Sequence, residues 1–176
     1  STTHYNYCKT ERIGFLCYED SYYPERLKII DNPPPLFYYR GRLNLIDDYP
    51  CFAMVGTRTC STDGLKLAYK TAYEASSCGG VIVNGLADGI DGACIAASLD
   101  ANGYAIGVLG CGIDRIYPEK NKDIFYKLSA NGLILTEFAP FTEPKGSNFP
   151  IRNRVISGLC VATVIFEASA ERSGAM

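Results

Sequence analysis

The chain has 176 residues, 47% of them apolar, which suffices for one domain with a buried core and is too few for two domains of ordinary size. Its formal net charge of −2 at pH 7 excludes a general attraction to polyanions, so any nucleic-acid role must depend on a local cluster of Lys and Arg. The eight cysteines form no Cys-x-x-Cys pair and the single histidine is His4, so we expect no metal site. We expect no cofactor either.

Residues 1–48 are predicted to form an N-terminal extension that packs on the core as an extended arm or a small cap. Within it, DNPPPLFYYRGRLNLI (31–46) places three prolines before an aromatic run and a Gly-Arg turn. Residues 1–30 are polar and contain no apolar signal region, so secretion is not expected. No stretch approaches the ~20 apolar residues that cross a bilayer, so membrane insertion is not expected either.

Residues 49–176 are predicted to form the core, because short apolar runs recur along them. The runs are rich in β-branched residues and continuous rather than alternating, which is typical of strands buried on both faces of a parallel sheet. They are CFAMVGT (51–57), GVIVNG (80–85), AIGVLG (105–110), GLILTEF (132–138) and CVATVIFEA (160–168). Several cysteines lie in or beside these runs as free thiols, which favours a reducing compartment and predicts a cytoplasmic protein.

Helices are predicted between these strands. In residues 63–80 apolar side chains recur three or four apart before two glycines, which predicts a helix with a C-terminal stop. A second helix is expected to start at Asp91 and a third to span residues 121–130. The second is expected to carry one stripe formed by Ala93, Ile95 or Ala96, and Leu99.

Alternating strands and helices at this spacing predict an α/β fold. The expected architecture is a Rossmann-like, doubly wound, mainly parallel sheet with helices on both faces. Ligands of such folds bind at the carboxyl ends of the strands. After the last strand FEASAERSGAM stops where a further helix and strand would complete such a sheet, so the core is expected to be truncated.

Two glycine-rich turns follow the first two core strands. Backbone N–H groups at a helix N-terminus attract anions, and glycine allows close approach. In VGTRTCSTDG (55–64) Arg58 can bind a phosphate through its forked donors. In NGLADGIDG (84–92) the glycines surround Asp88 and Asp91. The alternative is that the glycines serve only tight turns and that Asp91 is a helix N-cap.

Basic residues gather after the third and fourth strands. Lys120 and Lys122 stand at a helix start, and Arg152 and Arg154 flank Asn153. Cations at a helix N-terminus oppose its dipole, so a polyanion would explain them. The alternative is that they are solvated or paired with nearby Glu or Asp. Tyr117 and Phe149 precede the two basic groups and could stack on bases, although local packing is the more common role of such residues.

Established catalytic and nucleotide-binding motifs are absent from the sequence. It contains no Gly-x-x-x-x-Gly-Lys-Ser/Thr motif and no Gly-x-Ser-x-Gly, and Gly-x-Gly-x-x-Gly does not follow the first core strand. We therefore expect no catalytic residue. The strand-end carboxylates are expected to cap helices and pair with Arg, and the alternative is that they converge as acid/base groups; they are Asp88, Asp91, Glu137 and Glu167.

Motifs spread over residues 22–174 occur together in a diagnostic order. They are YYPERLKIIDNPPPLFYYRG (22–41), MVGTR (54–58), GLADGIDGACIAASL (85–99), GCGIDRIYPEKN (110–121), GLILTEF (132–138), FPIRNRVISGL (149–159) and EASAERSG (167–174). In this order they resemble the bacterial DNA-processing protein A (DprA/Smf) family. The resemblance implies a single-stranded DNA-binding protein that protects incoming DNA and assists RecA loading in natural transformation. It also implies a homodimer without an established catalytic step.

The resemblance also assigns the expected binding residues. Arg58 is implied as the main phosphate ligand, in a loop shaped by Gly56 and Thr57. The glycine-rich anion loop is implied to contain Gly85, Ala87, Gly89 and Asp91. Two further groups are implied to line the DNA groove: Lys120 with Lys122, and Arg152 with Asn153 and Arg154.

The chain departs from the family pattern at three points. Ile95 stands near a position where the family often has His. After SGAM (173–176) members continue with a segment used for self-association, so we do not expect this sequence alone to account for dimer formation and RecA contact. The helical N-terminal and winged-helix-like domains of many members have no counterpart. The alternative function is that of a small-nucleotide-binding protein or a nucleoside-monophosphate phosphoribohydrolase-like enzyme. A third hypothesis is a degenerate or partial protein.

Overall fold

The computed structural model describes residues 2–168. The end of the predicted EASAERSG motif and the predicted truncation lie outside these residues. The strands are β1 (Gly14–Cys17), β2 (Leu36–Gly41), β3 (Cys51–Gly56), β4 (Val81–Asn84), β5 (Ala105–Val108), β6 (Leu133–Thr136) and β7 (Ala162–Phe166). The α-helices are α1 (Thr2–Thr10), α2 (Glu25–Lys28), α3 (Thr62–Ser77), α4 (Ile90–Asp100), α5 (Lys122–Asn131) and α6 (Asn148–Leu159), with short 3₁₀ turns η1 (Ile46–Asp48) and η2 (Glu119–Asn121).

The strands form one sheet in the order β1-β2-β6-β5-β4-β3-β7. From β6 to β7 all neighbours are parallel. The chain moves stepwise from β3 to β6 and then crosses back to place β7 on the other side of β3. These five strands are the five apolar runs of the sequence, so the mainly parallel, Rossmann-like sheet is confirmed.

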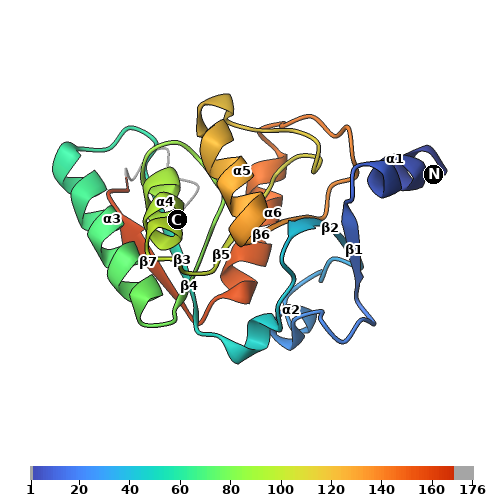
Figure 1. Cartoon of the computed structure of the whole chain (residues 1–176), viewed down its shortest axis with the longest axis horizontal. Coiled ribbons are helices and arrows are strands. Elements are labelled where there is room, and N and C mark those ends of the chain that lie inside the picture. The colour runs from blue at the N-terminus through green and yellow to red at the C-terminus, as the bar shows by residue number, and fades with distance from the viewer. Residues whose placement is uncertain (1, 169–176) are drawn as a thin grey trace.

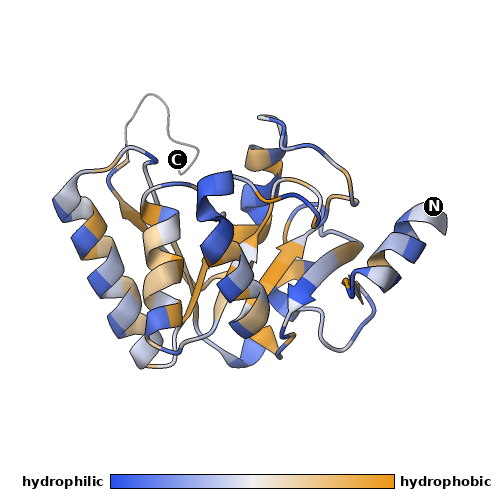
Figure 2. Cartoon of the chain, turned by 45° about the horizontal axis from the view of Figure 1, so that its top comes forward, coloured by the Kyte–Doolittle hydropathy of each residue, from blue (hydrophilic) through white to orange (hydrophobic). Residues whose placement is uncertain are grey.

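Helices cover both faces of this sheet. Right-handed crossovers that advance in one direction leave their helices on the same face, and the return crossover uses the other face. Accordingly α3, α4 and α5 lie side by side in front of the sheet, and α6 lies behind it (Figure 1). One core cluster joins Ala72, Ile95 and Leu128 to the first face, and another joins Val155 and Leu159 to the second. Apolar residues concentrate in the strands between these layers (Figure 2).

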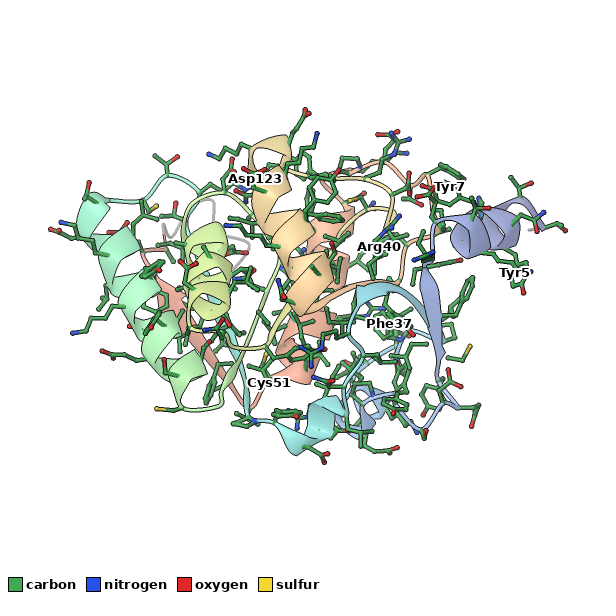
Figure 3. The ribbon with its side chains drawn as sticks, viewed as in Figure 1. Tyr5, Tyr7, Phe37, Arg40, Cys51 and Asp123 are labelled. Atoms are coloured by element: carbon green, nitrogen blue, oxygen red, sulfur yellow. The ribbon has the colours of Figure 1, made fainter. Side chains whose placement is uncertain are left out.

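Part of the N-terminal extension extends the sheet instead of packing against it as an arm or cap. β2 pairs antiparallel with β6, with Tyr38 opposite Thr136, and β1 pairs antiparallel with β2. The aromatic run of residues 36–41 is therefore a strand, and its Phe37 is fully buried. α1, which carries Tyr5 and Tyr7, stands at the end of the molecule beyond β1 (Figure 3).

Helix α4 buries more of its surface than the sequence pattern suggested. Of the predicted stripe, Ile95 is fully buried, whereas Ala93, Ala96 and Leu99 are only partly buried. Residues such as Cys94 and Ala97 are buried instead. α4 packs extensively against α3 and also contacts α5 and the sheet, so small residues are needed almost all around it.

Other properties of the described chain concern thiols and membranes. All eight cysteines are free thiols. No helix within residues 2–168 is both long enough and apolar enough to span a bilayer. The same residues contain no group of three His, Cys, Asp or Glu side chains that could hold a metal ion.

Candidate nucleic-acid interface

The carboxyl ends of the parallel strands form one rim of the domain. The loops after β3, β4 and β5 there lead into α3, α4 and α5. Cys51, which begins β3, and Asp123, near the start of α5, lie at opposite ends of the fold, and the rim is the end near Asp123 (Figure 3). β3 and β7 are neighbours although the chain leaves β3 in the other direction, so this rim includes the topological switch point where such folds bind ligands.

Asp91 holds the first two strand-end loops together. Its Oδ1 accepts from the Gly56 backbone N–H at 3.4 Å, and its Oδ2 accepts from Gly85 N–H at 3.2 Å. Burial raises the pKa of the Asp91 carboxyl to about 6, although Arg152 opposes this rise. Asp91 is not the N-cap of α4, because that position is occupied by Gly89. The carboxyl group is therefore placed to position the loops and does not face solvent.

Arg152 is buried beneath the same loops. It is only 7% exposed, and its guanidinium donates to the backbone oxygens of Gly85 and Val108. Burial lowers its pKa, and the Asp91 carboxylate opposes that fall. A Cβ at Gly85 would lie 2.4 Å from Arg152 Nη2, so the glycine makes room for the guanidinium. This glycine therefore serves internal packing.

Gly89 brings the second loop against the first. Its φ of +77° is the left-handed conformation that glycine adopts without strain. A Cβ there would lie 2.6 Å from the carbonyl oxygens of Thr57 and Arg58. The Thr57 N–H is bonded to Glu167 O at 2.9 Å, which ties this loop to the end of β7 as well. The loop that carries Arg58 and the loop that carries Gly89 are therefore in direct contact.

Arg58 is the exposed cation at the centre of this rim. Among residues 2–168, no carboxylate forms an ion pair with it. Its guanidinium lies over the Phe149 ring at 6.0 Å from the centroid, and Arg152 lies 5.8 Å from the same centroid. Arg58 also lines a cavity of about 570 Å³ together with Gly89 and Lys120. Arg58 therefore lies between the cavity, which it lines, and the Phe149 ring, which it contacts.

One of the two predicted lysines, Lys120, lines the cavity on the α5 side. Lys120 is exposed and pairs with Asp88 at 3.0 Å. Lys122 is exposed at the first position of α5. Between them, Asn121 Nδ2 donates to the backbone oxygens of Leu86 and Ala87 at 2.9 and 3.0 Å. Asn121 thus fixes the lysines relative to the glycine-rich loop.

Arg154 is turned away from this set of cations. Its guanidinium forms a two-pronged pair with the Glu137 carboxylate at 2.5 and 2.7 Å. It also donates to Ile151 O and to Asn32 O on the α6 side. Asn153 Oδ1 accepts from Arg152 Nε at 3.1 Å. The RNR motif therefore supports the rim from within, and its direct contact with DNA remains a prediction.

Two asparagines were missed by the sequence analysis. Asn84 is fully buried at the end of β4 and donates to Met54 O and Asp91 O at 3.1 and 3.0 Å. Asn121 makes the contacts described above. An Asn that directly ends an apolar strand run was the available signal for Asn84, because a buried amide requires several partners.

The N-terminus of α3 is already occupied by a side chain. Glu167 Oε2 accepts from Ser61 N–H at 2.7 Å, and its other oxygen accepts from the Ser61 hydroxyl. These bonds hold the pKa of the Glu167 carboxyl below its usual value. A Cβ at Gly64 would lie 2.4 Å from the same carboxylate. A ligand anion at this rim is therefore better accommodated beside Arg58 than at the first turn of α3.

The fold and the rim together define a Rossmann-like α/β protein with exposed cations around a cavity at its strand ends. Residues 14–176 match the model of a family described as DNA recombination-mediator protein A, and the chain belongs to this family. The DprA/Smf resemblance inferred from the sequence is thus confirmed. Membership does not favour the nucleotide-binding or phosphoribohydrolase alternative.

Known relatives agree with this assignment. The chain is 41% identical to Protein Smf of Synechocystis over 92% of its own length and 41% of that protein. It is 40% identical to DNA processing protein DprA of Streptococcus pneumoniae over 89% of its length and 55% of that protein. The chain therefore spans about half the length of these relatives.

Two solved structures share the fold. The X-ray structure of DprA from Streptococcus pneumoniae has a TM-score of 0.89 at 36% identity, with 99% of this chain and 60% of that chain covered. The second is DNA processing protein A from Helicobacter pylori, reported with its single-stranded DNA binding mode. It matches with a TM-score of 0.84 at 29% identity, and the match covers 93% of this chain and 72% of that chain.

Proposed function

We propose that the protein binds single-stranded DNA along the strand-end rim, as a DNA-processing protein that protects incoming strands during transformation and recombination. The observation that carries the proposal is Arg58, an exposed guanidinium without a carboxylate partner among residues 2–168. Its position beside the cavity matches the place where a phosphodiester would meet the α/β switch point. The single-stranded DNA binding mode of the Helicobacter pylori relative supports the same ligand.

The proposed roles of the predicted residues follow from their burial. Arg58, Lys120 and Lys122 are exposed and contact phosphates directly. Asp91 and Arg152 are buried and hold the loops at the required separation. Because few contacts reach base edges, binding depends weakly on sequence and strongly on salt.

Replacing Arg58 by Ala tests the proposal. A hydrogen bond to a charged group contributes about 1.5–3 kcal/mol, so affinity for a fluorescent oligothymidylate should fall roughly 10- to 150-fold. The slope of log affinity against log salt should become less negative by about 0.7, the value of one phosphate contact on a single strand. Fluorescence anisotropy across a salt series measures both quantities, with duplex DNA as the comparator.

Lys70→Ala is the matched control for this experiment. Lys70 lies about two turns inside α3, is 73% exposed and forms only a loose 3.8 Å pair with Glu74. Its loss removes one positive charge away from the rim, so affinity should change little. Unchanged binding by Arg58→Ala, or an equal loss in Lys70→Ala, would contradict the proposed site.

The finer parts of the proposal come from family membership. They are RecA loading, homodimer formation, a cytoplasmic location and the absence of a catalytic step. The family description as a recombination mediator supports the first and the last of these. Co-sedimentation with RecA and light scattering of the purified protein test the two assembly properties.

A further inference from the structure

A pair of stacked aromatic rings stands next to Arg58. Tyr117, in the loop between β5 and α5, stacks on Phe149 in the first turn of α6, with ring centroids 5.6 Å apart and planes inclined by 20°. A Cβ at Gly110 would lie 2.6 Å from the Phe149 ring. The missing side chain at Gly110 therefore lets Phe149 rest against the end of β5, with Tyr117 outermost.

The inner ring of this pair is bordered by two guanidinium groups. Arg58 and Arg152 lie 6.0 and 5.8 Å from the Phe149 centroid. Arg152 is buried, whereas Arg58 is exposed and lines the cavity. An aromatic surface and a phosphate-binding cation therefore lie side by side, as a nucleotide with its base and phosphate requires.

Tyr117 is packed against Phe149 but remains substantially exposed to solvent. It is 40% exposed, although its ring already stacks on Phe149. A stacked pair on α3 provides a comparison: Tyr73 is 41% exposed and stacks on Tyr69 at 6.4 Å. A carboxylate lies beside that pair, because the Tyr69 hydroxyl donates a hydrogen bond to Asp100 at 2.6 Å. Among the three stacked ring pairs within residues 2–168, Tyr117 with Phe149 is the one that a guanidinium approaches.

We propose that the exposed part of Tyr117 is a base-stacking subsite, which binds one nucleobase of the strand whose phosphate is held by Arg58. This inference rests on the proposed function and adds a basis for strand selection. Bases in a duplex are stacked on their neighbours and cannot lie on Tyr117, whereas bases of a single strand can. Stacking is tolerant of sequence because every base has a π face.

A tryptophan reporter tests the subsite directly, because the chain contains no tryptophan. Tyr117→Trp introduces one indole at the subsite, and Tyr73→Trp introduces one at the matched pair on α3. Oligothymidylate should quench the emission of the Tyr117→Trp variant and leave that of the Tyr73→Trp variant unchanged. An abasic oligonucleotide of equal length supplies the same phosphates and should bind without quenching.

Affinity measurements complete the test. Tyr117→Ala should weaken oligothymidylate binding roughly tenfold with an unchanged salt slope, and Tyr117→Phe should restore it, because the ring and not the hydroxyl stacks. Binding by anisotropy without quenching in the Tyr117→Trp variant, or equal quenching in the Tyr73→Trp variant, would overturn the subsite and leave the proposed function intact. Absence of all DNA binding would overturn both.

Discussion

Replacing Gly85 by Ala should destabilise the protein strongly, because the new Cβ would enter the space of the Arg152 guanidinium. The Cβ would lie 2.4 Å from Nη2, 2.6 Å from Cζ and 2.7 Å from Nη1. An exposed arginine would swing aside, but Arg152 is 7% exposed and donates from Nη1 to Gly85 O and Val108 O. Moving it loses at least one such bond.

The expected cost follows from these contacts. Overpacking a filled interior costs about 1–3 kcal/mol, and a lost hydrogen bond to a charged group costs about 1.5–3 kcal/mol. The free energy of unfolding should therefore fall by about 2.5–6 kcal/mol. Urea unfolding followed by far-ultraviolet circular dichroism, with linear extrapolation to water, measures this change.

Two further variants decide whether the guanidinium is the cause. Gly146 has no atom within 4 Å of its would-be Cβ and no positive φ, so Gly146→Ala should be neutral or slightly stabilising. In an Arg152→Met background the clash is relieved, and Gly85→Ala should then cost at least about 2 kcal/mol less than in the wild type. A change below about 0.5 kcal/mol for Gly85→Ala alone, or strict additivity in the double mutant, would refute the reasoning.

The remaining predictions concern two carboxylates. Because burial raises the pKa of the folded Asp91 carboxyl to about 6, above its ordinary value of 3.8, its ionisation opposes folding. As pH rises from 4 to 6, the wild type should therefore lose up to about 3 kcal/mol of unfolding free energy relative to Asp91→Asn. Above pH 6 the difference should level off. Paired urea titrations at each pH measure it, and a pH-independent difference would contradict the shifted pKa. Glu137→Gln should lower stability by about 1–3 kcal/mol by removing one prong of the Arg154 pair, and an unchanged urea midpoint would show that this pair contributes nothing.

The parallel core was readable from the sequence because its strands are continuous apolar runs that end in glycine or a polar residue. When such runs alternate with helices, few folds other than a parallel α/β sheet can accommodate them. The location of the two glycine-rich turns at one rim follows from the same pattern, since the carboxyl ends of neighbouring parallel strands share one rim.

Other features depended on contacts between distant parts of the chain. Nothing local in the RNR motif distinguishes Arg152, which is buried, from Arg154, which pairs with Glu137. The burial of Arg152 requires Gly85, far away along the chain, to lack a side chain. β2 was missed because three prolines precede it, and its partner β6 lies on the far side of the core sequence.

The pairing of β2 with β6 sets an order of assembly during synthesis. Translation delivers β2 roughly 100 residues before β6, an interval of about 5–20 s at cellular elongation rates. During that time β2 can pair only with β1, where Leu16 lies opposite Phe37, and its other edge has no partner. The first strands to emerge are thus among the last to be incorporated, and a chaperone that shields aromatic segments would have its longest opportunity there.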